Sequence, residues 1–142
     1  GKRKRSKLDG VVLTLLKQIH NPKGDIYHAM KKSDDGFDGF GEAYFSTIHQ
    51  GDIKGWKKHT KMTLNLVVPV GEIEFVIYDE NIKEFFSVKI SQDNYQRLTV
   101  KPNLWMAFRG MQENSILLNL ASIEHNPDEA SNIEISKISY EW

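Results

Sequence analysis

The sequence predicts an all-β domain that closes into a β-barrel or a jelly-roll sandwich. Short runs of alternating apolar and polar residues follow one another along the chain, and turn residues interrupt them about every ten positions. No segment has the spacing of a helix longer than about two turns. Roughly eight to ten short strands in one domain leave many unpaired edges unless the sheet closes, which favours a barrel.

The length and charge of the chain limit the functions it can have. Its 142 residues fit one domain, which we place at residues 9–142, and 19 Lys and Arg balance 19 Asp and Glu. A surface without net charge gives no reason to expect a nucleic-acid partner. No apolar run approaches the roughly 18 residues of a membrane span, and no apolar leader is recognisable. We therefore expect no membrane partner and a cytoplasmic location.

The chain contains no cysteine, which excludes disulfides, thiolate metal sites and thiol catalysis. Residues 1–8 are strongly basic. Such a run can be a nucleic-acid arm or a localisation signal, but it more often forms a solvated tail. We predict a disordered tail there and assign it no function.

The first half of the chain contains two clear strands. Residues 11–16 form an apolar strand that ends before the turn residues 20–24. Residues 25–32 predict a short strand or a helical turn, and the glycine-rich residues 36–41 predict either a lid over the barrel mouth or a turn. The alternating segment Glu42–His49 predicts the next strand.

The most informative segment covers residues 53–79. Apolar residues occupy the even positions from Met62 to Val70, and polar residues occupy the odd positions from Lys57 to Asn65. One face of this segment therefore packs, while the other carries chemistry or water. Gly71 predicts a tight turn that joins two strands in a hairpin. Further strands are predicted at residues 85–90, 97–100, 104–109 and 115–121, and after a coil near 135–140.

Several segments together resemble one known family. Ile53–His59 and the two strands after it contain a basic residue, a glycine, a variable residue and a histidine, then a turn through glycine and a closing aspartate. This pattern resembles the core motif of the nucleotide-sugar 3,5-epimerases (dTDP-4-dehydrorhamnose 3,5-epimerase-like) and 3,4-ketoisomerases of the cupin family. Residues 102–108, 125–129 and 138–142 resemble later motifs of that family in the same order.

The resemblance implies a cupin-type β-barrel that works without a cofactor. It implies proton abstraction next to the ketone of a nucleoside-diphosphate 4-keto-6-deoxy hexose, in bacterial surface-glycan (O-antigen, capsule, lipopolysaccharide) biosynthesis. The implied partners are a nucleotide sugar and a second copy of the chain, since these barrels commonly pair through an exchanged N-terminal strand.

The sequence departs from the family at its functional positions. The family's catalytic histidine falls on Lys57, a second histidine falls on His59, and a later histidine falls near Met106. The family's two tyrosines fall near Asn119 and His125. A non-catalytic sugar-nucleotide-binding cupin is therefore an alternative function. A metal-dependent cupin is a third, but too few imidazole ligands remain, so we predict no metal.

Proton abstraction next to a ketone needs a base and a group that stabilises the enolate oxygen. Histidine titrates near neutral pH, which fits His59 as the base. Lys57 shares its strand face and fits either an electrophile or, without its proton, a base. His125 can replace the missing acid, and Tyr44 or Tyr78 can do so instead. The competing interpretation is a plain surface lysine for Lys57 and plain packing for the histidines and tyrosines.

Further side chains are candidates for holding the substrate. Cations bind a diphosphate, although surface charge explains them equally well. Trp56 and Trp105 can stack on a base or sugar, or be buried in the core. The predicted substrate-binding residues are Lys54, Lys61, Asn65, Tyr44, Arg109 and Asn119.

Overall fold

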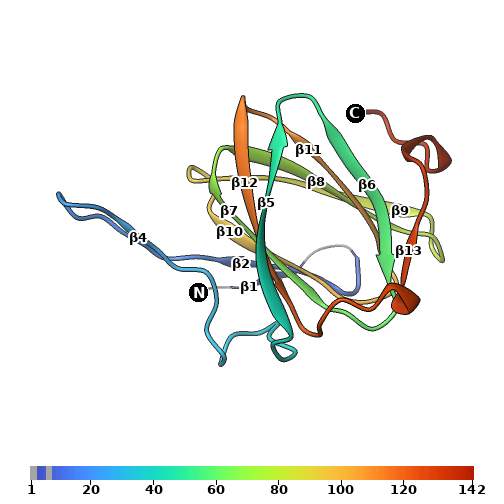
Figure 1. Ribbon diagram of the computed structural model, residues 1–142, viewed down its shortest axis with the longest axis horizontal. Helices are drawn as coiled ribbons and strands as arrows, with labels where there is room; N and C mark the ends of the chain where they lie inside the picture. The colour runs from blue at the N-terminus through green and yellow to red at the C-terminus, as the bar shows by residue number, and fades with distance from the viewer. Residues whose placement is uncertain (1–2, 6–7) are drawn as a thin grey trace.

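The computed structural model describes residues 3–5 and 8–142, and it shows two antiparallel sheets that face each other across one core (Figure 1). The strand order of the six-stranded sheet is β1 (Arg3–Arg5), β2 (Val11–Leu15), β10 (Gln96–Val100), β7 (Leu64–Val70), β12 (Asn114–Ala121) and β5 (Glu42–His49). The order of the five-stranded sheet is β13 (Ala130–Asn132), β6 (Ile53–His59), β11 (Trp105–Gly110), β8 (Glu72–Asp79) and β9 (Glu84–Ser91).

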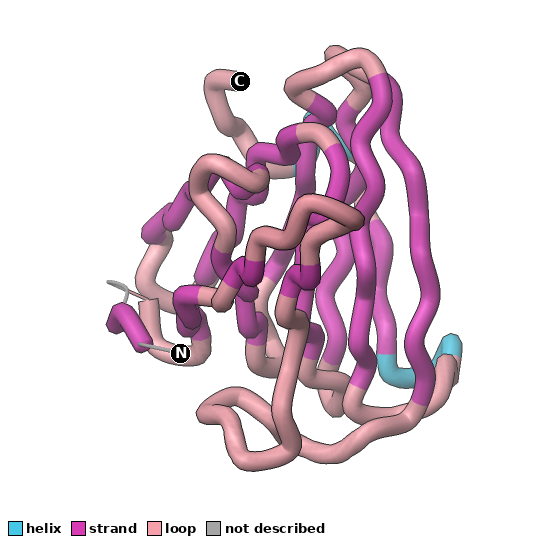
Figure 2. Tube along the Cα trace, turned by 90° about the vertical axis from the view of Figure 1, so that its left-hand side faces the viewer, coloured by secondary structure: helices cyan, strands magenta, loops and turns pink. Residues whose placement is uncertain are grey.

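The remaining elements are small. The ribbon of β3 (Gln18–Ile19) and β4 (Ile26–Tyr27) projects away from the barrel (Figure 1). Two short 3-10 helices, η1 (Pro127–Glu129) and η2 (Ile135–Lys137), lie among strands and loops (Figure 2). No helix in the described residues is long and apolar enough to cross a membrane. The predicted all-β barrel is confirmed.

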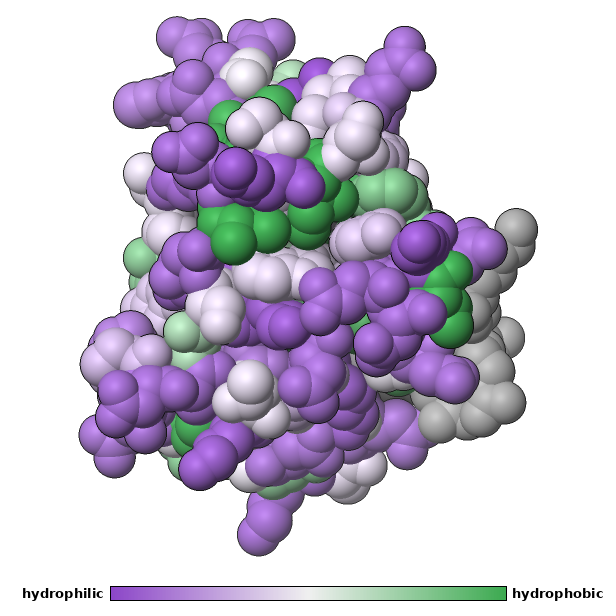
Figure 3. All heavy atoms as spheres, turned by 90° about the vertical axis from the view of Figure 1, so that its right-hand side faces the viewer, coloured by the Kyte–Doolittle hydropathy of each residue, from purple (hydrophilic) through white to green (hydrophobic). Residues whose placement is uncertain are grey.

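The core lies between the two sheets and follows the period-two pattern. Leu64, Leu66 and Val68 point inward from β7, and Phe75 and Ile77 face them from β8. Alternate side chains of one strand point to opposite faces, so burying one face selects every second residue. From the side of β13 and β9, the surface is mostly hydrophilic, with hydrophobic residues gathered in small areas (Figure 3).

The predicted hairpin through Gly71 is wrong. β7 pairs with β10 and β12, whereas β8 pairs with β11 and β9, so Gly71 carries the chain from one sheet to the other. Gly71 has a φ of 82°, and a Cβ there would collide with Ser115 and the carbonyl of Asn114. In a sequence, a lone glycine between two strands does not show whether the strands pair with each other or belong to different sheets. The true hairpin joins β8 to β9.

The predicted terminal strand near residues 135–140 is also wrong. The chain forms η2 there, and the last strand is β13 at Ala130–Asn132. Apolar residues of this segment pack instead on the outer face of the five-stranded sheet, where Trp56 is fully buried and its Nε1 donates to the carbonyl of Ile135 at 3.1 Å. Alternation therefore reports a face that packs, without requiring a strand.

The predicted tail is partly ordered. Arg3–Arg5 form β1 along β2, and Leu8 is buried in the core, so disorder throughout residues 1–8 is wrong for these positions. Residues 1–2 and 6–7 lie outside the described residues. The unpaired edge of β2 offers backbone groups that β1 can bond. Within residues 25–32, the short-strand alternative is correct, because β4 forms there.

Residues 29–38 lie on the outer face of the six-stranded sheet. Thr63 Oγ1 donates to Asp38 at 2.8 Å, and Asn65 Nδ2 donates to the carbonyl of Gly36 at 3.0 Å. At the end of the glycine-rich segment, the Gly41 amide donates to the carbonyl of Ala121. None of residues 36–41 lines the interior cavity described below.

Candidate functional site

A cavity of about 220 Å³ lies inside the barrel and receives side chains from both sheets. Its apolar wall comes from β7, β11 and β12, and its polar wall comes mainly from β5 and β6. A concave, largely apolar cavity with a few convergent polar groups is the usual form of a small-molecule site. The lining residues are Tyr44, Ser46, Lys54, Gly55, Lys57, His59, Leu64, Leu66, Met106, Phe108, Leu117, Asn119 and Asn132.

Five of the residues singled out from the sequence meet in this cavity: Tyr44, Lys54, Lys57, His59 and Asn119. Lys57 and His59 reach it because both are odd-numbered residues of β6 and share its inward face. Trp56 and Lys58 of that strand face outward. Lys54 is even-numbered and yet lines the cavity, because the register of β6 with β11 shifts between Gly55 and Lys57.

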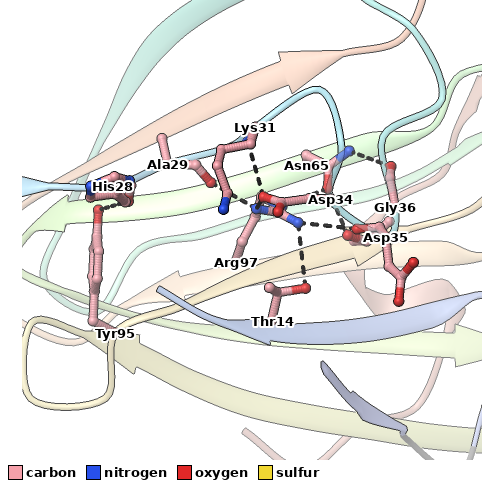
Figure 4. Close-up of polar contacts among 11 residues, drawn as sticks. Thr14, His28, Ala29, Lys31, Asp34, Asp35, Gly36, Asn65, Tyr95 and Arg97 are labelled. Atoms are coloured by element: carbon pink, nitrogen blue, oxygen red, sulfur yellow. Dashed lines mark hydrogen bonds and ion pairs between the residues drawn. The ribbon is translucent and has the colours of Figure 1, made fainter. Parts of the chain in front are cut away.

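The structure does not support the prediction that Asn65 binds the substrate, because Asn65 lies outside the cavity. Its Oδ1 accepts from Arg97 Nε at 3.0 Å and Thr99 Oγ1 at 2.6 Å on the outer side of the sheet (Figure 4). In β7 the even-numbered residues Leu64 and Leu66 face the cavity, so the inward parity changes between β6 and β7. Residues 60–63 connect these strands outside regular β-structure, and the odd positions cannot be extrapolated across them.

The structure also does not support the prediction that Arg109 binds the substrate. Its Nη2 pairs with Glu74 at 2.9 Å, and its Nη1 donates to the carbonyl of Trp142 at 3.0 Å. Arg109 does not line the cavity, and these contacts hold the C-terminal residues against the barrel. The sequence showed a cation on a strand, but not the face on which it stands.

Lys61, His125 and Tyr78 also lie outside the cavity. Lys61 and His125 are exposed, and each donates its backbone amide to a glutamate, Lys61 to Glu129 and His125 to Glu42. Tyr78 stacks on Phe85 with ring centroids 4.5 Å apart. Their loop or outward positions separate them from the five residues that meet in the cavity.

His59 is paired with a buried carboxylate. Its Nδ1 lies 2.5 Å from Oε2 of Glu129, which is 3% exposed. Oε1 of Glu129 accepts the backbone N–H groups of Lys61 at 3.0 Å and Met62 at 2.9 Å. Because a carboxylate accepts at Nδ1, the proton belongs there, and Nε2, which has no hydrogen-bond partner among the described residues, keeps its lone pair.

The hydrogen bonds to Glu129 decide its ionisation. Burial raises the pKa of this carboxyl, but the bonds from His59, Met62 and Lys61 outweigh burial and hold the pKa below its usual range. Glu129 is therefore a carboxylate at neutral pH. It can orient the imidazole ring and stabilise the imidazolium that forms when His59 takes a proton.

Local structure places Glu129 beside His59. The Asn126 side chain accepts from the Asp128 amide and starts η1, with Pro127 at its first position. β13 then runs antiparallel to β6, with Ala130 opposite His59. On the other side, the Asn103 amide donates to the carbonyl of His59 at 2.6 Å.

Lys57 occupies the middle of a row across the five-stranded sheet. Met106 of β11 is opposite it on one side and Asn132 of β13 on the other, and all three line the cavity. No carboxylate is among the cavity-lining residues. Lys54 also lines the cavity, and its Nζ donates to the carbonyl of Thr47 at 2.6 Å. The cavity is thus locally cationic in a chain with no net charge.

Tyr44 and Asn119 form a second polar pair in the cavity. Asn119 Nδ2 donates to the Tyr44 hydroxyl at 2.9 Å. Burial and the nearby Glu42 raise the pKa of Tyr44, although the bond from Asn119 acts in the opposite direction. Tyr44 therefore keeps its proton and can donate it. Oδ1 of Asn119 is buried without a partner among the described residues.

A family model described as "FdtA: WxcM-like, C-terminal" matches residues 9–134. The chain belongs to this family. No curated protein sequence matches it. Among the described residues, no group of three or more His, Asp or Glu side chains could hold a metal ion in this WxcM-like domain.

Solved structures show the same fold. A dTDP sugar isomerase from Desulfovibrio desulfuricans G20 is 29% identical, with a TM-score of 0.89 over 94% of this chain and 91% of that one. The rmlC epimerase of Mycobacterium tuberculosis is 18% identical, with a TM-score of 0.85 over 100% and 78%. A histidine-to-asparagine variant of the 3,4-ketoisomerase QdtA from Thermoanaerobacterium thermosaccharolyticum is 22% identical, with a TM-score of 0.76 over 87% and 88%. The predicted cupin-type barrel and the resemblance to nucleotide-sugar epimerases and ketoisomerases are confirmed.

Sequence reasoning missed Glu129 and Asn132 of this WxcM-like domain. Glu129 is 70 residues from His59 in the chain, and only the pairing of β13 with β6 brings the two together. The motif at residues 125–129 was a usable signal, since it ends in this carboxylate. Met106 of the apolar wall lies in the motif at residues 102–108, whereas Leu117 belongs to no motif that could have indicated its position in the cavity.

Proposed function

We propose that this WxcM-like domain is a sugar-nucleotide epimerase or isomerase. It moves a proton at a carbon next to the ketone of a dTDP-linked 4-keto-6-deoxy hexose. The observation that carries the proposal is the His59–Glu129 pair, which opens into the cavity with a free imidazole nitrogen. The names of the related structures support the substrate class, because the QdtA variant is in complex with TDP-4-keto-6-deoxyglucose.

His59 is the proposed base. Its Nε2 takes the proton from the carbon beside the ketone, and the Glu129 carboxylate stabilises the resulting imidazolium. Return of a proton to the opposite face of the same carbon inverts its configuration. Return to the former ketone carbon shifts the ketone by one position. Both outcomes need the same base, so the product distinguishes an epimerase from a ketoisomerase.

The negative charge that develops on the ketone oxygen needs a donor. Tyr44, held by Asn119, and Lys57 are the cavity residues that can supply one. Lys54 and Lys57 without a lining carboxylate also favour a dianionic diphosphate over a neutral sugar. His125 lies outside the cavity and is not proposed as the acid.

The second candidate is a non-catalytic protein that binds the same sugar nucleotide. Lys57, Met106 and Asn119 occupy positions where the resembling family has histidines and a tyrosine, which favours lost catalysis. The His59–Glu129 pair favours the enzyme, because a binding protein does not need a buried carboxylate that activates an imidazole.

We also propose a cytoplasmic homodimer that serves bacterial surface-glycan synthesis. The projecting ribbon supports the dimer, since Ile19 and Ile26 lie opposite each other and remain 36% and 56% exposed. An isolated two-stranded ribbon is marginally stable in water, so contact with a second copy would stabilise it. Light scattering after gel filtration should give twice the chain mass, and an Ile26→Lys variant should shift it toward the monomer.

The decisive experiment is deuterium incorporation from heavy water into dTDP-4-keto-6-deoxyglucose, followed by NMR. Native protein should incorporate deuterium at carbon 3 or 5, and His59→Asn should lower the rate by about 10²–10⁴-fold because the base is lost. His49→Asn is the matched control, since His49 is exposed and outside the cavity. Binding without exchange in the native protein would favour the second candidate, and neither binding nor exchange would leave only the fold.

A further inference from the structure

The amino group of Lys57 has surroundings unlike those of its neighbour Lys58. Lys58 points outward and pairs with Glu80 at 3.0 Å, with its ammonium over the Trp105 ring. Lys57 points into the cavity and forms no ion pair with any described residue. Two adjacent lysines on one strand therefore stand in opposite environments.

The surroundings of Lys57 are those of a reactive amine. Its neighbours across the sheet are an apolar thioether, Met106, and a neutral amide, Asn132. A second cation, Lys54, and the imidazole of His59 line the same cavity, and none of the described residues that line it is a carboxylate. A lysine placed in an apolar site beside another cation is one of the arrangements that activate it as a nucleophile toward carbonyl groups.

We propose that Lys57 forms a reversible imine with the ketone of the substrate. This inference rests on the proposed function, because that function supplies a ketone to the cavity. His59 accepts a proton from the Lys57 ammonium, and the neutral amine adds to the ketone carbon to form a C–N bond. The carbinolamine oxygen then takes one proton from the attacking nitrogen and one from the His59 imidazolium, and the C–O bond breaks as water leaves. In balance, one ammonium and one ketone give one protonated imine and one water.

The imine explains why a lysine can stand where the resembling family has a catalytic histidine. A protonated imine withdraws electrons from the neighbouring carbon more strongly than a ketone does, so His59 can remove the adjacent proton as the enamine forms. Hydrolysis later returns the ketone to its original carbon. The intermediate therefore serves inversion of configuration next to the ketone, and it selects epimerisation over a shift of the ketone.

Borohydride trapping tests this inference. Native protein is mixed with dTDP-4-keto-6-deoxyglucose, reduced, and analysed by intact mass and peptide mapping. We expect an adduct of the substrate mass less one water plus two hydrogens, located on Lys57. Lys58→Arg is the matched control and should keep the adduct, because Lys58 faces outward. Lys57→Arg should abolish the adduct while keeping the positive charge.

Deuterium exchange separates the two roles of Lys57. If the imine carries the reaction, Lys57→Arg loses as much exchange as Lys57→Met. If Lys57 acts only as a cation, Lys57→Arg keeps most of the exchange, and the proposal is wrong. Circular dichroism and the urea unfolding midpoint of each variant show whether the barrel has folded. Native exchange without an adduct overturns the imine alone, whereas absence of exchange overturns the proposed function as well.

Discussion

Two buried polar clusters lie on different sides of the barrel wall, one around Arg97 outside the six-stranded sheet and one around His59 inside the barrel. Arg97 is fully buried, and its three nitrogens donate to five acceptors (Figure 4). The inner cluster contains the paired His59, but also Lys57 without an ion pair and an unpartnered Asn119 Oδ1 among the described residues. Both clusters are polar and enclosed, yet only the outer one is saturated.

This difference shows how to separate structural from functional polar groups in a small barrel. A buried charge is tolerated when every donor is matched, and Arg97 is matched by side chains and by backbone carbonyls of residues 29–35. Groups left open in a cavity cost stability and persist where a ligand uses them. The comparison therefore assigns Arg97 to holding residues 29–35 on the sheet and the cavity to chemistry.

The largest expected effect comes from breaking the outer cluster. Arg97→Met should lower the free energy of unfolding by about 3–5 kcal/mol, because Asp34 and Asn65 lose a buried partner. Urea denaturation measures this, and the exchange rate per folded molecule should stay unchanged. A loss below about 1 kcal/mol, or a selective loss of exchange, would contradict the assignment of Arg97 to structure.

Breaking the inner cluster should mainly lower deuterium exchange, whereas breaking the outer cluster mainly lowers stability. Glu129→Gln should lower deuterium exchange by about 100-fold or more, because an amide neither fixes the required tautomer nor stabilises the imidazolium. Nucleotide affinity, measured by calorimetry with dTDP, should be unchanged since Glu129 does not line the cavity. Equal losses of binding and exchange would show that Glu129 shapes the cavity instead of positioning His59.

Acid titration should test whether Glu129 of the inner cluster is ionised. The pKa of Glu129 is lowered on folding, so its contribution to stability is present above the unfolded-state pKa and is lost as pH falls through the folded value. The unfolding free energies of native protein and Glu129→Gln should therefore differ most near neutral pH. They should begin to approach each other at about pH 4.3, where an unfolded glutamate titrates, and converge once the pH falls below the folded pKa. Urea titrations at several pH values measure this difference. A constant difference down to strong acid would mean that Glu129 is not ionised.

The smallest effect should come from a position remote from both clusters. Lys83, in the turn between β8 and β9, has a φ of 56°. This left-handed backbone conformation is unfavourable for residues that have a Cβ. Lys83→Gly should raise the free energy of unfolding by about 0.5–1 kcal/mol, with unchanged exchange. Thermal and urea unfolding check the first part. A change in exchange would show that stability and chemistry are coupled through the whole barrel.

The sequence by itself determined the local features of this protein. Period-two alternation located most strands, and parity put Lys57 and His59 on one face of β6, because a strand's backbone geometry points alternate side chains in opposite directions. The order of motifs from Ile53–His59 onward was sufficient to identify the family, since those residues stand in the chain in the family's order.

Only the tertiary structure decided which distant segments meet. It sent β7 and β8 into different sheets at Gly71, turned Asn65 outward, and brought Glu129 to His59. Periodicity describes one strand at a time, whereas strand partners are chosen by the burial of whole faces and by hydrogen bonds between remote segments. The strands could therefore be located from the sequence, whereas the contact between His59 and Glu129 depended on how the strands closed into a barrel.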